Sequence, residues 1–329
     1  MIKKTIIINL IFIIVLVVLL EFAVKSFNLS GIMGMDSHLI EKVNFIHKLK
    51  KNNEGKVFGK TIYTDSNGFR VPSKNFKYSK NKSSIFFIGD STTFGNGVDE
   101  PNTFVGKLRI EKKKFNFLNS AVPGYQIIEH EKNINILHEF TNIKKIFYVF
   151  TLNDVFEINQ IYNVDKKKGV INPDENFFDK LKKIKIFSFI NVYLRNKSHL
   201  YMFIKGIASD PPRRHFKHVL SYYKNKNEYL NVKNYFTKLK KYSDHNNIYL
   251  TVLILPYEFQ TRKNNCSGEN LIPQSTIEKI LISLKIEYRN YTSLFCNFKN
   301  PKKLYYKFDP MHLSKEGHSL IFLEIEKEI

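Results

Sequence analysis

Short apolar runs that alternate with amphipathic stretches constrain the fold of this 329-residue chain more than any other feature. Five such runs end at small or polar residues, at 84–89, 115–121, 145–154, 247–256 and, more weakly, 285–292. Helical patterns lie between several of them, as in 229–239, where apolar residues recur every three or four positions. Buried apolar strands separated by helices indicate a parallel sheet with helices on both faces. Ligands of such sheets bind beyond the carboxyl ends of the strands.

The N-terminal run at 5–24 is long and apolar enough to cross a membrane, and Lys3 and Lys4 precede it. A helix of about 20 residues spans the ~30 Å hydrocarbon core of a bilayer. Because the run is apolar on every side, a buried core helix is a poor alternative. The two lysines favour a cytoplasmic N-terminus and an exported body. No small-x-small cleavage site follows, so an uncleaved signal anchor is preferred to a cleaved signal peptide, although cleavage near Ala23 stays open.

These features predict a cytoplasmic tail at 1–4, a transmembrane signal anchor at 5–24, a stalk at 25–57 and a domain at 58–329. The stretch 157–228 is rich in lysine, tyrosine and asparagine, and is interpreted as an insertion of helices beside the site. The expected location is a membrane, crossed once, with the domain extracytoplasmic, in a periplasm or at the cell surface.

The chain carries 52 lysines and arginines against 30 acidic residues, a net charge of +22. The lysines are spread along the chain without a nucleic-acid-binding motif, so we expect a solvated surface and no nucleic-acid partner, with weak attraction to acidic glycans or lipids as the second interpretation. For Arg70, a structural ion pair is preferred to a contact with substrate. The two cysteines, Cys266 and Cys296, form no C-x-x-C pair, which disfavours a metal site. Two idle thiols are preferred to a disulfide, and the pairing stays open because sequence does not give their separation in space.

Four short motifs stand at the ends of the apolar runs or near the C-terminus. The first run leads into Gly-Asp-Ser at Ser91, and Gly124 follows the second. The third run leads into Asn153, and a D-x-x-H motif at Asp309 and His312 comes much later. Each motif alone is weak, since such residues also form turns and helix caps. Together, in this order, they resemble the four blocks of the SGNH (GDSL-type) hydrolase family, and the resemblance covers the domain after the stalk.

The resemblance implies that Ser91 is a nucleophile, that His312 is its base and that Asp309 orients the base. A serine hydroxyl needs a neighbouring base, and a carboxylate that accepts from the second ring nitrogen fixes the imidazole tautomer. The resemblance also implies an oxyanion hole made by the backbone N–H groups of Ser91 and Gly124 and the side-chain amide of Asn153. Preorganised donors of this kind contribute several kcal/mol to catalysis. This chemistry requires no metal and no cofactor.

Three polar residues beside these motifs receive no catalytic role. Asp90 and Asp154 are expected to order their loops by accepting bonds from backbone N–H groups. His318 lies in the expected last helix, lacks an aspartate three residues earlier and is interpreted as a surface or packing residue.

The implied fold is an α/β, three-layer α/β/α sandwich with a parallel, flavodoxin-like sheet of about five strands, plus the N-terminal transmembrane helix. The favoured function is serine-dependent ester hydrolysis that removes acyl or acetyl groups from envelope glycans or lipids. Two alternatives stay open. One is an O-acyltransferase that acts on an extracytoplasmic polysaccharide, and the other is a non-catalytic envelope binding or assembly protein that keeps the fold.

Overall fold

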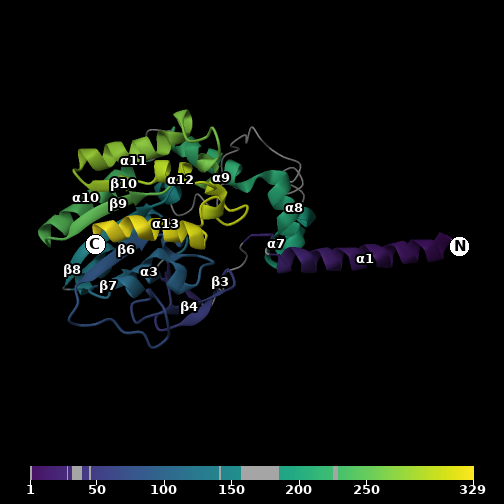
Figure 1. Cartoon of the computed structure of the whole chain (residues 1–329), viewed down its shortest axis with the longest axis horizontal. Helices are drawn as coiled ribbons and strands as arrows, with labels where there is room; N and C mark the ends of the chain where they lie inside the picture. The colour runs from purple at the N-terminus through teal and green to yellow at the C-terminus, as the bar shows by residue number, and fades with distance from the viewer. Residues whose placement is uncertain are drawn as a thin grey trace.

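The computed structural model of the chain describes residues 2–27, 29–31, 39–43, 46–140, 142–156, 185–224 and 229–329. In this part of the chain, one large sheet has the strand order β10-β9-β8-β6-β7-β5-β4-β3 (Figure 1). The first five strands in that order are parallel to one another: β10 (Glu287–Asn290), β9 (Tyr249–Ile254), β8 (Ile143–Phe150), β6 (Ser84–Gly89) and β7 (Asn116–Asn119). Numbered along the chain, these five strands have the order 2-1-3-4-5, which is the flavodoxin-like order.

The five parallel strands coincide with the five apolar runs, so the predicted parallel sheet is confirmed. The predicted number of about five strands is too small for the whole sheet, because three antiparallel strands extend it: β5 (Arg70–Val71), β4 (Lys60–Thr64) and β3 (Glu54–Val57). Arg70 of β5 pairs with Asn119 of β7 and so covers the edge of the parallel part. An uncovered strand edge is a template for pairing with other chains.

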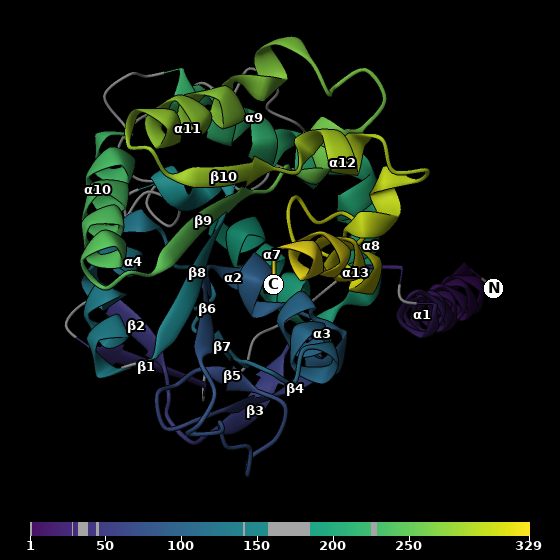
Figure 2. The ribbon, with the colours of Figure 1, turned by 60° about the vertical axis from the view of Figure 1, so that its left-hand side comes forward.

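Helices cover both faces of the sheet, as Figure 2 shows. Along β8, Ile146, Tyr148 and Phe150 face one apolar core, whereas Phe147 and Val149 face the other. A pleated strand that is buried on both faces produces this alternation. The helices over the first core are α4 (Ile127–Asn133), α9 (Pro211–Tyr223), α10 (Leu230–His245) and α11 (Ile272–Ser283). Those over the second core are α3 (Phe104–Glu111), α12 (Thr292–Cys296) and α13 (Lys315–Ile325).

A small hairpin of β1 (Ile40–Val43) and β2 (Ile46–Leu49) precedes the sheet. Leu39 and Leu49 are buried in a third apolar cluster together with Val57 and Ile62. The hairpin and β3 lie within the range predicted as a stalk, so part of that range packs on the domain. Short 3₁₀ helices occupy connections: η2 (Glu100–Asn102), η3 (Ile134–Glu139), η4 (Leu152–Val155), η5 (Glu258–Thr261), η6 (Gly268–Leu271), η7 (Pro301–Leu304) and η8 (Glu326–Glu328).

The N-terminal helix α1 (Ile2–Ser26) projects away from the domain (Figure 1). The most apolar 18-residue window of its segment Lys4–Ser26 has a mean hydropathy of 3.1, and no residue of that window is buried. By length and composition it can cross a membrane as an anchor or act as a signal sequence. Of the predicted insertion, 157–184 and 225–228 lie outside the described residues. The remainder forms α7 (Lys185–Lys197), α8 (His199–Ser209) and α9.

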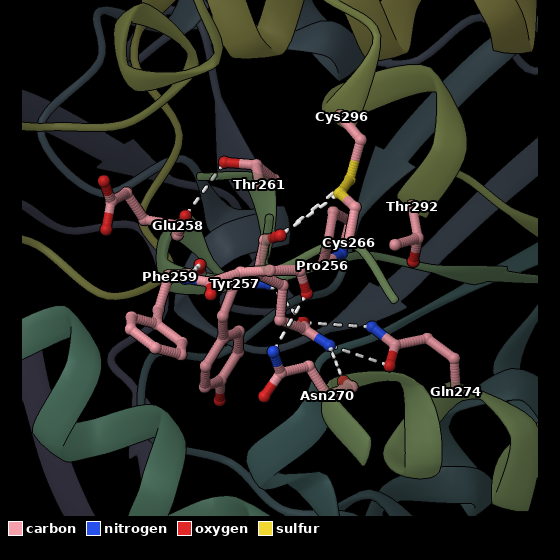
Figure 3. Close-up of a disulfide and its surroundings, with 12 residues drawn as sticks. Pro256, Tyr257, Glu258, Phe259, Thr261, Cys266, Asn270, Gln274, Thr292 and Cys296 are labelled. Carbon is pink, nitrogen blue, oxygen red and sulfur yellow. Dashed lines mark hydrogen bonds between the residues drawn. A yellow bond between two sulfur atoms is a disulfide. The ribbon is translucent and has the colours of Figure 1, made fainter. Parts of the chain in front are cut away.

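Cys266 and Cys296 form a disulfide, with their Cα atoms 6.3 Å apart (Figure 3). The preference for two idle thiols is therefore wrong. The cysteines are 30 residues apart in the sequence, and the fold brings them together because β10 pairs with β9 and leads the chain back through α12. Disulfides persist in oxidising compartments, so this bond and the N-terminal apolar helix suggest an extracytoplasmic location.

Candidate active site

Ser91 stands at the carboxyl end of β6, where the chain turns sharply into the short helix α2 (Ser91–Phe94). The side chain of Asp90 caps this helix by accepting a 2.8 Å hydrogen bond from the Thr92 amide. Gly89 makes the turn possible, because a Cβ atom there would lie 2.1 Å from the hydroxyl oxygen of Thr93. Because Ser91 directly follows the end of β6, its hydroxyl lies at the carboxyl edge of the sheet, and 7% of the surface of the residue is exposed there.

Arg70 holds the loop that follows Ser91. Its guanidinium donates to the carbonyl oxygens of Phe94 at 2.6 Å, Gly95 at 2.8 Å and Val98 at 2.5 Å. The residue is fully buried, and burial lowers its pKa to about 10. The expected ion pair is therefore wrong, because the planar fork of donors satisfies backbone carbonyls instead of a carboxylate.

The loop before α13 brings Asp309 and His312 to Ser91. The Nδ1 atom of His312 lies 2.8 Å from Asp309 Oδ2, and its Nε2 atom lies 2.8 Å from Ser91 Oγ. The other carboxylate oxygen of Asp309 accepts bonds from the backbone N–H groups of His312 at 2.7 Å and Met311 at 2.9 Å. One local turn therefore presents both groups, and the fold brings together the three residues that the sequence singled out.

The charges of this group are coupled. Burial alone would lower the pKa of His312, but the facing Asp309 carboxylate, with Asp90 nearby, outweighs burial and raises it above the usual value. Burial would raise the pKa of Asp309, and the attraction and hydrogen bonds from His312 reverse that effect and lower it. An aligned hydroxyl, imidazole and carboxylate can transfer a proton from the hydroxyl to the imidazole while the hydroxyl oxygen attacks a carbon.

Gly124 lies in a tight turn beside the end of β6. Tyr125 N donates to Val122 O at 3.2 Å, Pro123 and Gly124 are the central residues, and Val122 N donates to Gly89 O at 3.1 Å. Gly124 has φ +81°, a conformation that side-chain-bearing residues rarely adopt. A Pro-Gly pair with a positive φ at the glycine fits a type II turn, whose third position favours glycine.

Asn153 lies in η4, directly after β8, and its side chain is buried. Its Oδ1 atom accepts a 2.6 Å hydrogen bond from the hydroxyl of Tyr257, so the orientation of the amide is fixed. Tyr257, which stands just beyond the carboxyl end of β9, was not among the residues predicted from the sequence. The position itself was the available signal, because the other candidate residues also follow strand ends.

Below these residues, Thr151 joins the loops after β6 and β8. Its hydroxyl lies 2.9 Å from Asp90 Oδ2 and 3.0 Å from Asp154 Oδ1, and the Tyr148 hydroxyl donates to Asp154 Oδ2 at 3.0 Å. Burial and the neighbouring Asp90 raise the pKa of Asp154 well above its usual value. Burial also raises the pKa of Asp90, against hydrogen bonds that lower it. These groups stabilise the two loops from beneath.

His318 is fully buried, and its Nδ1 accepts a 3.3 Å bond from the amide of Phe104. Burial lowers its pKa to about 3, with nearby cations adding to the effect. It packs under α3 rather than at Ser91. Within the described ranges, no group of three or more His, Cys, Asp or Glu side chains is arranged to hold a metal ion.

No family model matches the chain, and no curated protein matches it. Solved structures that it resembles include a lipolytic protein of the G-D-S-L family from Veillonella parvula (12% identity, TM-score 0.42, 74% of this chain and 97% of that chain). A second is a lipase/acylhydrolase from Enterococcus faecalis (11% identity, TM-score 0.43, 75% of this chain and 95% of that chain). A third is a phospholipase A1 from Streptomyces albidoflavus (11% identity, TM-score 0.43, 74% of this chain and 98% of that chain). These neighbours are lipolytic hydrolases of the type that the four motifs resemble. At such identities and scores they carry no argument of their own, so the function below rests on the site.

Proposed function

We propose that this protein is a serine-dependent ester hydrolase of the SGNH type. The observation that carries the proposal is the line of Ser91 Oγ, the His312 imidazole and the Asp309 carboxylate, with 2.8 Å at each junction, at the carboxyl edge of a parallel sheet. This edge is where open α/β sheets bind their ligands.

In the proposed reaction, Ser91 Oγ attacks the acyl carbon of an ester and gives its proton to Nε2 of His312. Asp309 accepts from the Nδ1–H and stabilises the imidazolium. The oxyanion receives hydrogen bonds from the backbone N–H groups of Ser91 and Gly124 and from the Asn153 amide. The alcohol leaves with the proton from His312, and water then hydrolyses the acyl-Ser91 ester by the same proton transfers in reverse.

The proposed location is extracytoplasmic, with α1 as an uncleaved single-pass anchor and with residues 58–329, extended by β3 and the β1–β2 hairpin, as the catalytic domain. The apolar helix and the disulfide support this placement. The proposed substrates are acyl or acetyl esters on envelope glycans or lipids.

The test measures p-nitrophenyl acetate turnover by the detergent-solubilised full chain, by Ser91→Ala and by Ser120→Ala. Ser120 is the matched control, because its hydroxyl stands after the neighbouring strand and donates to the Phe87 carbonyl. We expect a rate loss of about 10⁴-fold or more in Ser91→Ala only. Mass spectrometry of the denatured wild type should show one acetyl group on Ser91. A folded wild type that neither turns over nor acylates would contradict the proposal, and added sugar acceptors would reveal transfer in place of hydrolysis.

A further inference from the structure

Helices α7 and α8 expose large apolar side chains. On α8, Ile204 and Ile207 are 50% and 63% exposed, and they lie one helical turn apart. On α7, Phe189 and Tyr193, again one turn apart, are 74% and 59% exposed. We call these four residues the α7–α8 apolar surface. Broad exposed apolar surfaces on folded proteins mark contacts with a partner or a membrane.

The N-terminus of α8 is hydrogen-bonded to the C-terminal part of the apolar helix α1. The Glu21 carboxylate accepts bonds from the Ser198 hydroxyl at 2.7 Å and from the backbone N–H groups of His199 at 2.6 Å and Leu200 at 3.0 Å. The hydroxyl of Ser30 lies 2.8 Å from Nδ1 of His199. A carboxylate that caps a helix N-terminus stabilises this arrangement. The start of α8 therefore lies at the level where α1 would leave a bilayer.

In Figure 1, α8 runs across the axis of α1 rather than along it. If α1 crosses a bilayer, α8 consequently lies along the membrane surface. Amphipathic helices in this position bury their apolar face at the boundary between headgroups and acyl chains. Three exposed cations, Arg195 and Lys197 at the end of α7 and Lys307 beside α8, stand close to this level, where lipid phosphates lie.

An adjacent side of α8 packs on the loop that carries the candidate base. Gly206 is buried against the ring of Phe308, and a Cβ atom at Gly206 would lie 2.4 Å from that ring. The rings of Phe203 and Phe308 are 6.1 Å apart between centroids. Phe308 directly precedes Asp309. Helix α8 thus contacts the catalytic loop through Phe203 and Gly206 and exposes apolar side chains at Ile204 and Ile207.

We propose that the α7–α8 apolar surface docks on the same bilayer that α1 crosses and holds the Ser91 site at the headgroup level. The occupant is the lipid surface, because the apolar surface continues from the end of an apolar membrane-length helix and exposed cations accompany it. The substrate class that follows, resting on the proposed esterase function, is an ester carried by a membrane lipid or a lipid-linked molecule rather than a freely soluble ester.

The chain contains no tryptophan, which allows a direct test of docking. Single variants Ile204→Trp and Ile207→Trp of the full chain would be reconstituted into vesicles of phosphatidylcholine and phosphatidylglycerol with brominated acyl chains. The matched control is Ile282→Trp, at a residue that is 60% exposed on α11, and this helix lies away from α1 in both views (Figures 1 and 2). We expect bromine to quench the fluorescence of the α8 variants at least threefold more than that of the control. Equal quenching at all three sites overturns the proposal, with circular dichroism verifying the fold of each variant.

A second experiment separates this proposal from the esterase function. Ile204→Asp/Ile207→Asp and the control Ile282→Asp would be assayed on a long-chain p-nitrophenyl ester in vesicles and on p-nitrophenyl acetate in solution. We expect the ratio of the vesicle rate to the solution rate to fall about tenfold in the double variant only, because a charge at the interface opposes insertion. An unchanged ratio overturns the substrate class. If the wild type hydrolyses neither ester, the esterase function fails while the quenching experiment still decides the docking.

Discussion

Two regions of this molecule depart in opposite ways from the usual separation of apolar interior and polar surface. At the carboxyl edge of the sheet, the side chains of Asp90, Asn153 and Asp154 are buried. In α1, α7 and α8, by contrast, large apolar side chains such as Leu19 and Phe189 are exposed. Single exposed apolar residues are common, whereas buried polar groups and broad exposed apolar surfaces carry information about function.

The two departures are stabilised differently. Asp90 and Asn153 have hydrogen-bond partners on neighbouring loops, and Asp154 accepts bonds from Thr151 and Tyr148, so the protein itself compensates these three side chains for the loss of water. The exposed apolar side chains of α1 meet no covering element in the part of the chain that the structure describes. Substitutions that remove one hydrogen-bonding group therefore test the sheet edge. Changes in the contact between the exposed helices and lipid test the second region.

Beyond the Ser91 variant, replacing Asp309 with Asn should have the largest effect at the sheet edge, a fall in kcat of about 10⁴-fold, because the base loses its orienting carboxylate. Asn can still accept the backbone N–H bonds through its Oδ1, so the turn should survive. Esterase activity requires neutral His312, so kcat/KM falls on the acidic side with a midpoint above 6.5, given the raised pKa. In Asp309→Asn only burial acts strongly, and the midpoint should move to lower pH. An unmoved midpoint in a pH–rate profile would contradict the assigned pair.

Replacing Asn153 with Ala should lower kcat by about 10²–10³-fold, because one oxyanion donor is lost. KM should change little, since the donor acts mainly in the transition state. Steady-state kinetics on p-nitrophenyl acetate provide the measurement. A change confined to KM would mean that Asn153 binds substrate without stabilising the transition state.

Replacing Tyr257 with Phe should lower kcat by about tenfold, because the Asn153 amide loses the bond that fixes its orientation. The matched control is Tyr305→Phe, whose buried hydroxyl donates to the carbonyl of the neighbouring Pro256 at 2.8 Å. Both variants should lose about 1 kcal/mol of stability, and only Tyr257→Phe should lose activity. In the Asn153→Ala background the Tyr257 effect should disappear, and additive losses would exclude a positioning role.

The sequence predicted the parallel part of the fold because strand periodicity and residue order are local properties. It also singled out Ser91, Asp309 and His312, which the fold brings to hydrogen-bond distance across 221 positions of the chain. Their catalytic roles stay proposals. A strand and a short extended piece over 61–72 could be predicted from the sequence, but their antiparallel pairing with the sheet could not, because β5 has only two residues and its pairing depends on the edge that β7 leaves open.

The misses involve partners that only the tertiary structure supplies. Arg70 was expected to meet a carboxylate, yet the loop after Ser91 offers it three carbonyl oxygens. For Cys266 and Cys296 two idle thiols were preferred with the pairing left open, and the return of the chain through α12 joins them. In both cases the sequence drew attention to the residue but did not predict its partner, because the local sequence pattern carries no information about contacts across long loops.

The smallest expected effect belongs to the second region, at the junction of α1 and α8. Replacing Glu21 with Ala removes the acceptor for the amides of His199 and Leu200, and a lost helix cap costs about 1 kcal/mol. Hydrogen exchange of these two amides should accelerate about fivefold in the reconstituted full chain, since RT is ~0.6 kcal/mol. Glu21→Gln, which keeps an acceptor oxygen, should show a smaller change. Unchanged exchange in Glu21→Ala would mean that lipid contact alone holds α8 beside α1, whereas the expected acceleration would show that the exposed region also depends on a polar bond.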